Sequence, residues 1–407
     1  CKSMEWKEVR LGDVCDLIAG FAFKAKDFGE FPTKVIKIGD IKPPFVDYVG
    51  QVGVDISNYD INRLSKYTVK YGDYVLAMTG ATIGKVGKYI SKNFSYINQR
   101  VLKFSPKQNV DADYINYIIC SNIFAKYVVN YVDSESAQPN ISASTISKFA
   151  FQIPSEKDDQ RRIASILSSL DRKIELNNKI NADLEEMAQA IFKNWFVDFE
   201  PFKDGKFVDS ELGMIPEGWK VGRLTEIASY MNGLAMQKFP PENNEDSLPV
   251  LKIKELGQGF CGTDSDRCSC NIKDECKIHN GDVIFSWSGT LLVDVWCGGD
   301  CGLNQHLFKV TSKDYPKWFY YYWTKHHLQE FIHIAKDKAV TMGHIKRGHL
   351  EEALVAIPDN DSMERAHELF EPILSKMISL RLENSRLSLL RDTLLPRLMS
   401  GELEVPE

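Results

Sequence analysis

A glycine-rich segment at residues 80–85, Gly-Ala-Thr-Ile-Gly-Lys, is the first stretch of this 407-residue chain whose residue types could carry chemistry. It resembles a phosphate-binding loop, in which backbone N–H groups surround the phosphates of a nucleotide. The spacing between its glycines is too short by a single residue, and Val86 follows Lys85 where a Ser or Thr would hold magnesium. The segment therefore predicts a tight turn that presents Lys85, and it argues against a nucleotide site.

Residues 41–45, Ile-Lys-Pro-Pro-Phe, resemble the tetrapeptide with which amino-methyltransferases hold a target amine. That chemistry needs an acceptor oxygen before the two prolines, and Lys42 offers only donors. The sequence also contains no HExxH motif, no nucleophile elbow and no metal-dependent nuclease cluster. We therefore expect a protein that is not itself an enzyme and that carries no cofactor of its own.

A cysteine-rich segment is the remaining place for a metal. Six of the nine cysteines lie between Cys261 and Cys301, but none of their spacings forms the CxxC pair that structural zinc sites favour. We expect reduced, partly buried thiols here and no metal site. An enzyme with an unrecognised, metal-dependent site in this segment is the alternative from another functional class.

Polar and basic loops point instead to nucleic-acid binding. The net charge of −6 argues against a generally basic protein, yet residues 74–110 contain six Lys or Arg and no acidic residue. Side chains of Asn, Gln, Lys and Arg read base edges and hold phosphates. Gln99 and Gln305 equally fit a buried, structural role, because each lies at the edge of an apolar strand. The candidate nucleic-acid contacts are Lys85, Lys88, Gln99, Arg100, Gln138 and Asn140 in the first half of the chain, and Ser288, Thr290, Gln305, His344, Lys346 and Arg347 in the second.

These candidates recur at equivalent places because the chain contains an internal repeat. Each copy places short strands first and an aromatic-rich helical stretch after them, at about 113–131 and 316–335. The repeat predicts an α+β fold with two similar domains of roughly 150 residues, each followed by a long helix. The matching segments are, in order, residues 5–20 with 218–233, 35–38 with 250–253, 71–76 with 280–285, 98–99 with 304–305, and 152–154 with 356–358.

Two long helices are expected after the two copies, at about residues 155–199 and 361–399. Their apolar residues repeat in heptads, with seven of ten seam positions apolar in the first helix and seven of nine in the second. The predicted seam of the first helix includes Lys173 and Met187. An ordinary amphipathic helix lying on one domain is the alternative for this first helix.

The two helices are expected to pair as an antiparallel coiled coil. That arrangement would place the two domains at opposite ends of a rod, roughly 50 Å apart for about 35 residues at ~1.5 Å each. Asn177 and Asn384 both lie near the midpoints of their seams, and midpoints cross in an antiparallel pair. We therefore predict that these asparagines lie close together, with Leu184 and Leu387 as further pairing positions. The predicted boundaries are 1–154 for the first domain, 155–200 for the central helix, 201–358 for the second domain and 359–407 for the C-terminal helix.

Three segments of the chain resemble a known family. They are residues 192–199 (FKNWFVDF), 212–219 (LGMIPEGW) and 394–403 (LLPRLMSGEL), and they look like the DNA specificity subunit of type I restriction-modification systems. The similarity covers nearly the whole chain, including the duplicated order of domain and helix. The resemblance implies two target recognition domains, each of which reads one half of a split, asymmetric site on double-stranded DNA.

The resemblance also implies partner subunits. Two modification (methyltransferase) subunits, which hold S-adenosylmethionine and methylate adenine, are expected to bind the helices. Restriction subunits that use ATP and magnesium are expected to join them. A stand-alone DNA-binding or scaffold protein without modification partners is the alternative function.

The chain contains no apolar run near the ~20 residues that cross a bilayer. Its first residues lack the charged and apolar regions of a signal peptide. We therefore expect a cytoplasmic protein with no membrane partner.

Overall fold

The structure is a computed structural model, which describes residues 4–132, 139–242, 247–337, 343–403 and 405. It divides into two compact units. The first comprises Cys1–Arg172 with Ser388–Glu407, and the second comprises Lys173–Leu387. The division passes through two long helices, so each unit contains a mixed α/β part and a stretch of both helices.

Short strands in the first unit form three sheets. The largest has the order β2 (Cys15–Ala19), β11 (Val101–Pro106), β8 (Tyr74–Ala77), β9 (Val86–Lys88), β5 (Phe45–Val46) and β4 (Ile41–Lys42). The next has the order β6 (Val52–Val54), β3 (Phe28–Ile36), β10 (Ser95–Ile97) and β7 (Thr68–Val69). In the third, β1 (Trp6–Arg10) pairs antiparallel with β12 (Ala150–Pro154). Val, Ile, Tyr and Phe dominate these strands because their side chains pack well on a pleated, buried surface.

Helices cover the largest sheet of the first unit on one side. Tyr114, Ile118 and Phe124 pack with Leu76 and Phe104 of the sheet in one hydrophobic core. The predicted helical stretch at 113–131 is two helices, because the hydroxyl oxygen of Ser121 accepts the N–H of Phe124 and so starts a new helix. The helices of this unit's α/β part are α1 (Leu11–Val14), α2 (Ile61–Leu64), α3 (Ala112–Ile119), α4 (Asn122–Asn130) and α5 (Ala143–Ser147).

The second unit repeats this plan with shorter sheets. One has the order β16 (Ser229–Asn232), β23 (Leu307–Thr311), β20 (Val283–Ser286) and β21 (Leu292–Val295). Another has the order β18 (Arg267–Ser269), β17 (Ser247–Leu251), β22 (Cys301–Leu303) and β19 (Lys277–Ile278). Two pairs complete it, β15 (Lys220–Arg223) with β24 (Leu354–Ile357) and β13 (Phe207–Ser210) with β14 (Gly213–Pro216). Its helices are α7 (Leu224–Ile227), α8 (Ile253–Gln258), α9 (Lys317–His326), α10 (Leu328–Asp337) and α11 (Arg347–Glu352).

Strand register confirms that the two units share a fold. The parallel pairing of β10 with β3 in the first unit recurs as β22 with β17 in the second. The antiparallel closing pair β1 with β12 recurs as β15 with β24. The predicted α+β fold with two similar domains is therefore correct.

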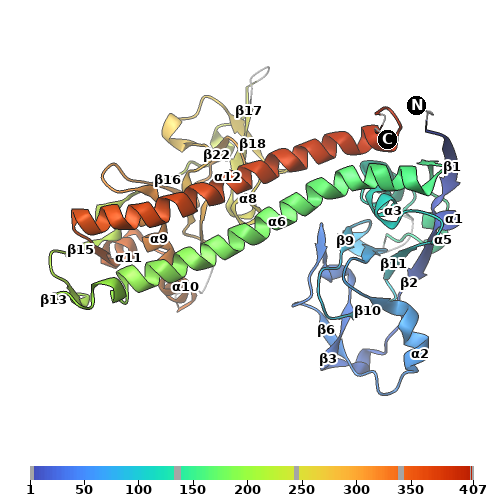
Figure 1. The fold of residues 1–407 in the computed structure, drawn as a ribbon, viewed down its shortest axis with the longest axis horizontal. Helices are drawn as coiled ribbons and strands as arrows, with labels where there is room; N and C mark the ends of the chain where they lie inside the picture. The colour runs from blue at the N-terminus through green and yellow to red at the C-terminus, as the bar shows by residue number, and fades with distance from the viewer. Residues whose placement is uncertain (1–3, 133–138, 243–246, 338–342, 404, 406–407) are drawn as a thin grey trace. The chain divides into compact units, whose positions relative to one another are not determined.

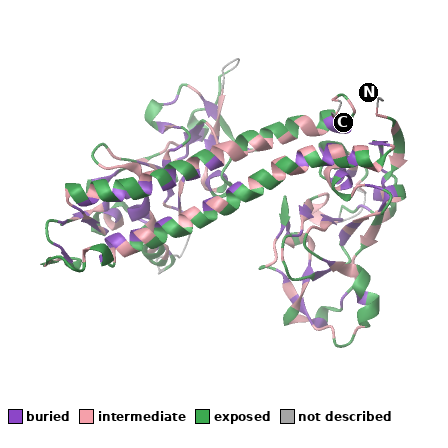
Figure 2. Cartoon of the chain, in the orientation of Figure 1, coloured by how far each residue is buried: buried purple, intermediate pink, exposed green. Residues whose placement is uncertain are grey.

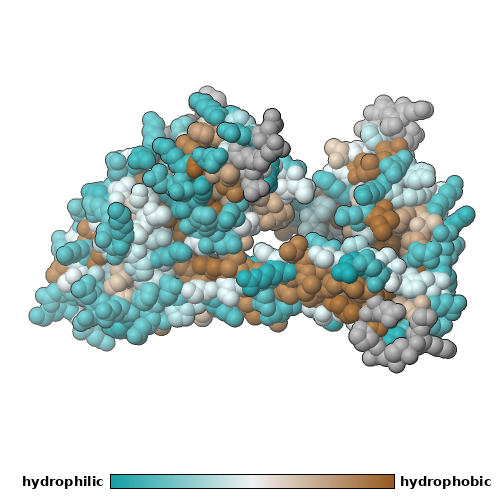
Figure 3. All heavy atoms as spheres, turned by 90° about the horizontal axis from the view of Figure 1, so that it is seen from above, coloured by the Kyte–Doolittle hydropathy of each residue, from teal (hydrophilic) through white to brown (hydrophobic). Residues whose placement is uncertain are grey.

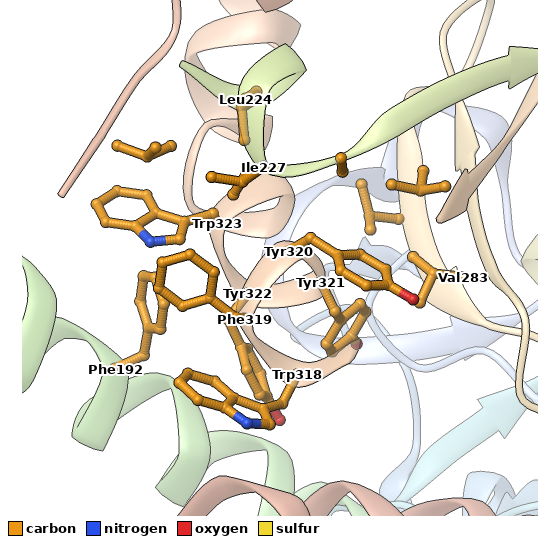
Figure 4. Close-up of a cluster of buried hydrophobic side chains, with 14 of the residues drawn as sticks. Phe192, Leu224, Ile227, Val283, Trp318, Phe319, Tyr320, Tyr321, Tyr322 and Trp323 are labelled. Carbon is orange, nitrogen blue, oxygen red and sulfur yellow. The ribbon is translucent and has the colours of Figure 1, made fainter. Parts of the chain in front are cut away.

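Aromatic side chains of α9 form the core of the second unit (Figure 4). Trp318 stacks on Phe370 with ring centroids 4.7 Å apart, and Trp323 meets Phe192 edge to face at 5.1 Å. Phe192 and Phe370 belong to the two long helices, so α9 joins these helices to the sheets. Large aromatic rings supply much of the apolar area that such a core buries.

The two long helices are α6 (Lys157–Phe196) and α12 (Asn360–Met399), each 40 residues long (Figure 1). Within the second unit, Asn177 of α6 contacts Asn384 of α12, whereas Phe192 lies beside Phe370. Residue numbers rise along one helix as they fall along the other, so the pair is antiparallel. This agrees with the coiled-coil pairing predicted from the heptads.

The predicted seam of α6 is wrong at two positions. Lys173 is exposed, and Met187 keeps 44% of its surface accessible, whereas Asn181 and Ala188 are buried. Buried, intermediate and exposed positions alternate along both long helices (Figure 2). A straight helix has 3.6 residues per turn, so its buried stripe drifts away from a 3.5-residue repeat. In addition, Ala188 packs in the core of the second unit. The buried face of α6 therefore contacts the α/β part of this unit as well as α12.

Candidate nucleic-acid interface

Three segments that are distant in sequence meet beyond the end of β8 in the first unit. The N–H of Met78 donates to the carbonyl oxygen of Arg100 (2.9 Å), and the N–H of Ile141 donates to that of Met78 (3.0 Å). The N–H of Gly80 donates to the carbonyl oxygen of Pro139 (3.2 Å). Residues 78–85, 98–100 and 139–141 therefore form one surface, which we call the first loop surface.

The second unit builds the same arrangement beyond the end of β20. The N–H of Ile345 donates to the carbonyl oxygen of Trp287 (3.1 Å), and the N–H of Gly289 donates to that of Gly343 (3.0 Å). The indole of Trp287 lies beside the imidazole of His306, with ring centroids 6.0 Å apart. Residues 287–290, 304–306 and 343–347 form the second loop surface.

Glycines make the close approach of these segments possible. A Cβ on Gly20 would lie 2.1 Å from the carbonyl oxygen of Asn98, and one on Gly233 would lie 2.2 Å from that of Leu303. Both distances are far below any real contact distance. The chain therefore needs glycine at residue 20, which passes the turn at 98–100, and at residue 233, which passes the turn at 304–306.

Four of the six candidates in the first half of the chain lie on the first loop surface. Lys85, Gln99, Arg100 and Asn140 are all exposed there. Lys88 does not join them, because it pairs with Tyr74 at the opposite end of β8 and is half-buried. Gln138 lies outside the described residues.

Five of the six candidates in the second half of the chain have accessible side chains. Thr290, His344 and Lys346 are exposed, and Gln305 is half-buried. Arg347 is exposed, but one of its Nη atoms donates to the carbonyl oxygen of Tyr230 (3.1 Å), so part of its hydrogen-bonding capacity is used within the fold. Ser288 keeps only 9% of its surface accessible, and its backbone forms a bridge with His344. The prediction of Ser288 as a surface contact therefore does not fit the structure.

The repeated Asn-Gln pair has two separate roles. The side-chain oxygen of Asn98 accepts the N–H of Gln99 (2.6 Å), and that of Asn304 accepts the N–H of His306 (3.2 Å). The asparagines therefore stabilise the turns, while Gln99 is exposed and Gln305 half-buried. Neither glutamine is buried, so the structural reading applies to the preceding asparagine.

The basic window at residues 74–110 is only partly available for a ligand. The ammonium group of Lys103 pairs with Asp73 at 2.8 Å and donates to the carbonyl oxygen of Thr68 (2.8 Å). Lys107 donates to the carbonyl oxygen of Gly12 (2.9 Å). These two lysines stabilise the sheet, and the charge of the first loop surface comes from Lys85 and Arg100.

Two cations bordering the first loop surface were not among the candidates. Phe21 forms a bridge with Asn98, and the guanidinium of Arg63 lies 5.9 Å from the Phe21 ring centroid. Phe21 also contacts Tyr67, over whose ring the ammonium group of Lys66 lies at 4.8 Å. Cations over aromatic faces hold their charge near the surface. Nothing in the spacing of these residues marks them, because the contact depends on the fold. His306 was not among the candidates either, although it occupies the same position of the repeat as the candidate Arg100.

Polar contacts attach the helices within each unit. In the second unit, Asn177 is fully buried, and its Nδ2 donates to Oδ1 of Asn384 and to Oε2 of Glu383, both at 2.9 Å. This is the contact that the heptad pattern predicted. Leu184 packs against the core of the second unit, and Leu387 is half-buried.

In the first unit, a carboxylate has the corresponding role. Asp171 of α6 accepts hydrogen bonds from the hydroxyl of Tyr117 (2.5 Å) and the guanidinium of Arg391 on α12 (2.8 Å). Burial, followed by the hydrogen bond to Asp171, raises the pKa of Tyr117, so its hydroxyl keeps the proton that it donates. One side chain of α6 thus contacts both α3 and α12.

The cysteine-rich segment carries thiols without disulfide bonds. Cys268, Cys276, Cys297 and Cys301 are buried, and Cys261 is partly accessible. Across the described part of the chain, His, Cys, Asp and Glu form no group of three or more placed to hold a metal ion. No helix among the same residues is long and apolar enough to span a bilayer.

Comparison with known proteins identifies the family. The family model described as type I restriction modification DNA specificity domain matches residues 3–186 and 216–381. The specificity subunit of the type I restriction enzyme MjaIX from Methanocaldococcus jannaschii is 30% identical, over 82% of this chain and 78% of that protein. That of HindI from Haemophilus influenzae is 23% identical, over 98% of this chain and all of that protein, 100%.

A solved structure shows the same fold. The crystal structure of a type I restriction-modification S subunit from M. genitalium aligns with a TM-score of 0.52 at 13% identity, covering 98% of this chain and 97% of that one. Two copies of the family's domain thus lie where the structure has its two α/β parts, in the order that the sequence repeat predicted. The chain therefore belongs to the family of DNA specificity subunits of type I restriction-modification systems.

Proposed function

We propose that the two units read the two halves of a split, asymmetric site on double-stranded DNA, each through its loop surface. The observation that carries this proposal is the duplication itself. Both loop surfaces share two equivalent backbone hydrogen bonds, Ile141 to Met78 with Ile345 to Trp287 and Gly80 to Pro139 with Gly289 to Gly343. They nevertheless present different side chains, such as Arg100 in one and His306 in the other. Two similar frameworks that carry different side chains are suited to reading two different half-sites.

Phosphate and base contacts divide between residue types on these surfaces. Lys85 and Lys346 are exposed cations on flexible stems, which suit phosphate contacts that position the protein without reading sequence. Gln99, Asn140, Thr290, Gln305 and His344 carry donors and acceptors that suit base edges. Binding should therefore weaken as salt rises, because the phosphate contacts release counterions.

The chain itself is proposed to be non-catalytic and to recruit catalytic partners. Two modification subunits that hold S-adenosylmethionine would methylate adenine at the site, and restriction subunits with ATP and magnesium would join them. The helices offer apolar side chains for such docking: Leu176, Leu389 and Leu390 are exposed by 53%, 70% and 46%. Figure 3 shows hydrophobic patches among the hydrophilic side chains of one face. Exposed apolar patches commonly mark protein interfaces.

The helix pair is proposed to determine the length of the unread spacer. α6 and α12 are each continuous over 40 residues, so neither contains a loop that could absorb a change of length. A stiff connection gives one preferred spacing of the half-sites, on the order of one DNA turn or about 34 Å centre to centre.

Selection of bound DNA tests the proposal. The tagged chain, purified from its host with the subunits that accompany it, would be mixed with a pool of randomised duplexes, and the retained duplexes sequenced. We expect a motif of two unlike parts separated by a spacer of fixed length. An undivided motif, or retention without any motif, would contradict it. Binding by the chain purified without a methyltransferase would favour the stand-alone alternative.

A further inference from the structure

The two loop surfaces can be compared position by position. Isolated bridges join Thr79 to Asn140 in the first unit and Ser288 to His344 in the second. A second pair of bridges joins Phe21 to Asn98 and Leu234 to Asn304. These four bridges make Asn140 equivalent to His344, and they make Arg100 equivalent to His306 because each lies two residues after the bridged asparagine.

Positions that shape the framework keep the same residue in both units. Gly80 and Gly289 both have positive φ, at 74° and 66°. A Cβ on either would approach an isoleucine methyl, 3.5 Å away on Ile38 and 3.6 Å away on Ile253. The framework is therefore held constant by glycine and by the turn-forming asparagine.

Two positions per surface combine exposure with a change of chemistry. Arg100 and Asn140 are exposed in the first unit, and His306 and His344 are exposed at the same positions in the second. Ala81 and Thr290, which follow the equivalent glycines, are also exposed and differ, but the alanine side chain carries no hydrogen-bonding group. A scaffold that keeps its backbone frame and varies exposed side chains separates the shape of a reader from its base preference.

The spacing of these positions suits a DNA groove. In the first unit the backbone of Met78 hydrogen-bonds to Arg100 on one side and to Ile141 on the other. Two interstrand steps of ~4.8 Å place the two flanking segments roughly 10 Å apart. In the second unit the Trp287 ring lies close to both histidines, with centroids 6.0 Å from His306 and 6.3 Å from His344. The roughly 10 Å between the flanking segments of the first unit fits within a major groove about 12 Å wide.

We propose that Arg100 and Asn140 set the base preference of the first half-site, and that His306 and His344 set that of the second. Arg100 would read a guanine through its O6 and N7 acceptors, and Asn140 an adenine through N6 and N7. Each imidazole offers at most one donor and one acceptor while neutral, so the second half-site is read with single hydrogen bonds and less discrimination. This inference rests on the proposed function of the two units as readers.

The test is the duplex selection described above, repeated with single variants of the full chain and its accompanying subunits. Arg100→Ala should abolish the guanine preference at one position of one half-site, a loss on the order of 10-fold or more in discrimination. Asn140→Ala should do the same for adenine in that half-site. His306→Ala and His344→Ala should change only the other half-site, so each variant has an internal control.

Two further variants separate base reading from charge and from misfolding. Arg100→Lys keeps the positive charge but loses the forked geometry, so the salt dependence of binding should stay while the guanine preference weakens less than in Arg100→Ala. Lys92→Ala removes an exposed cation of the same basic window that lies off the loop surface, and its selected motif should match that of the unaltered chain.

Other results would overturn the inference. A motif that Arg100→Ala and Asn140→Ala leave intact, with binding weakened equally on all sequences, would make these residues phosphate contacts. A change in the same half-site from Arg100→Ala and His306→Ala would refute the equivalence of the surfaces. If the unaltered chain selects no split motif, the proposed function itself is wrong. That result is distinguishable from a failure of the present inference, because it is seen without any variant.

Discussion

Removing the amide of Asn177 should loosen the helix pair in the second unit. Its Nδ2 donates to Asn384 and to the carboxylate of Glu383, both at 2.9 Å, and the residue is fully buried. A neutral hydrogen bond contributes about 1 kcal/mol and one to a charged group about 1.5–3 kcal/mol. The Glu383 side chain is 42% exposed and also lies 3.5 Å from Lys173, so water and that lysine offset part of the second contribution. We estimate a net cost of about 2 kcal/mol for Asn177→Ala.

Hydrogen exchange measures this cost locally, which suits a chain of two units whose global unfolding is not two-state. Amide exchange in peptides covering residues 173–188 and 377–390 should accelerate by roughly 30-fold for Asn177→Ala. Lys179→Ala, on an exposed position of the same helix, is the matched control and should change exchange little.

The double variant Asn177→Leu with Asn384→Leu tests whether the buried amide itself causes the loss of protection. Replacing both partners by apolar groups leaves no buried donor or acceptor unpaired at their mutual contact, so protection should return to at least the level of the unaltered chain. An acceleration below threefold for Asn177→Ala, or a double variant less protected than the single one, would refute this account of the buried amide.

The remaining predictions concern DNA binding, spacer length and pH. Lys85→Ala should weaken binding to most duplexes without altering the selected motif and should reduce the salt slope by about 1, measured by titration at several salt concentrations; a changed motif would contradict its role as a phosphate contact. Inserting four residues in α6, about 6 Å of helix, should lengthen the preferred spacer by roughly two base pairs in footprinting or selection, and an unchanged spacer would refute the helix pair as a ruler. Burial raises the pKa of Cys15 and of Tyr320 to about 12, above their ordinary values of 9.0 and 10.0. Because the unfolded chain releases these protons first, stability should be intact below about pH 9 and fall as pH rises toward 12, and a flat profile of unfolding over that range would contradict their burial.

The internal repeat made most of the fold predictable from the sequence. A local pattern such as the Lys-Ile of residues 37–38 and 252–253 carries little information alone, but its recurrence in the same order restricts both copies to one fold. The antiparallel pairing followed from the positions of Asn177 and Asn384, because a buried amide in a seam needs a polar partner. These inferences depended on order and periodicity, which the sequence displays directly.

The composition of each loop surface was less accessible from the sequence. Lys88 lies only three residues from Lys85, but β9 carries it to the far end of β8. Ser288 is buried although Gly289 and Thr290, which follow it directly, are exposed. Arg63 borders the surface through the ring of Phe21, which another segment contributes. Lys66 lies over the ring of its neighbour Tyr67, which packs against Phe21. Such outcomes depend on long-range pairing and on the direction of each side chain, and a shift of one residue in a strand reverses that direction.

Mapping of methylated adenines in the source genome, with and without the gene for this chain, tests the central claim most directly. We expect a methylated motif made of two unlike parts with an unread spacer of fixed length, and its disappearance when the gene is deleted. A methylation pattern that deletion leaves unchanged, or a motif that is undivided or has two identical halves, would contradict the claim that two different loop surfaces read one split site.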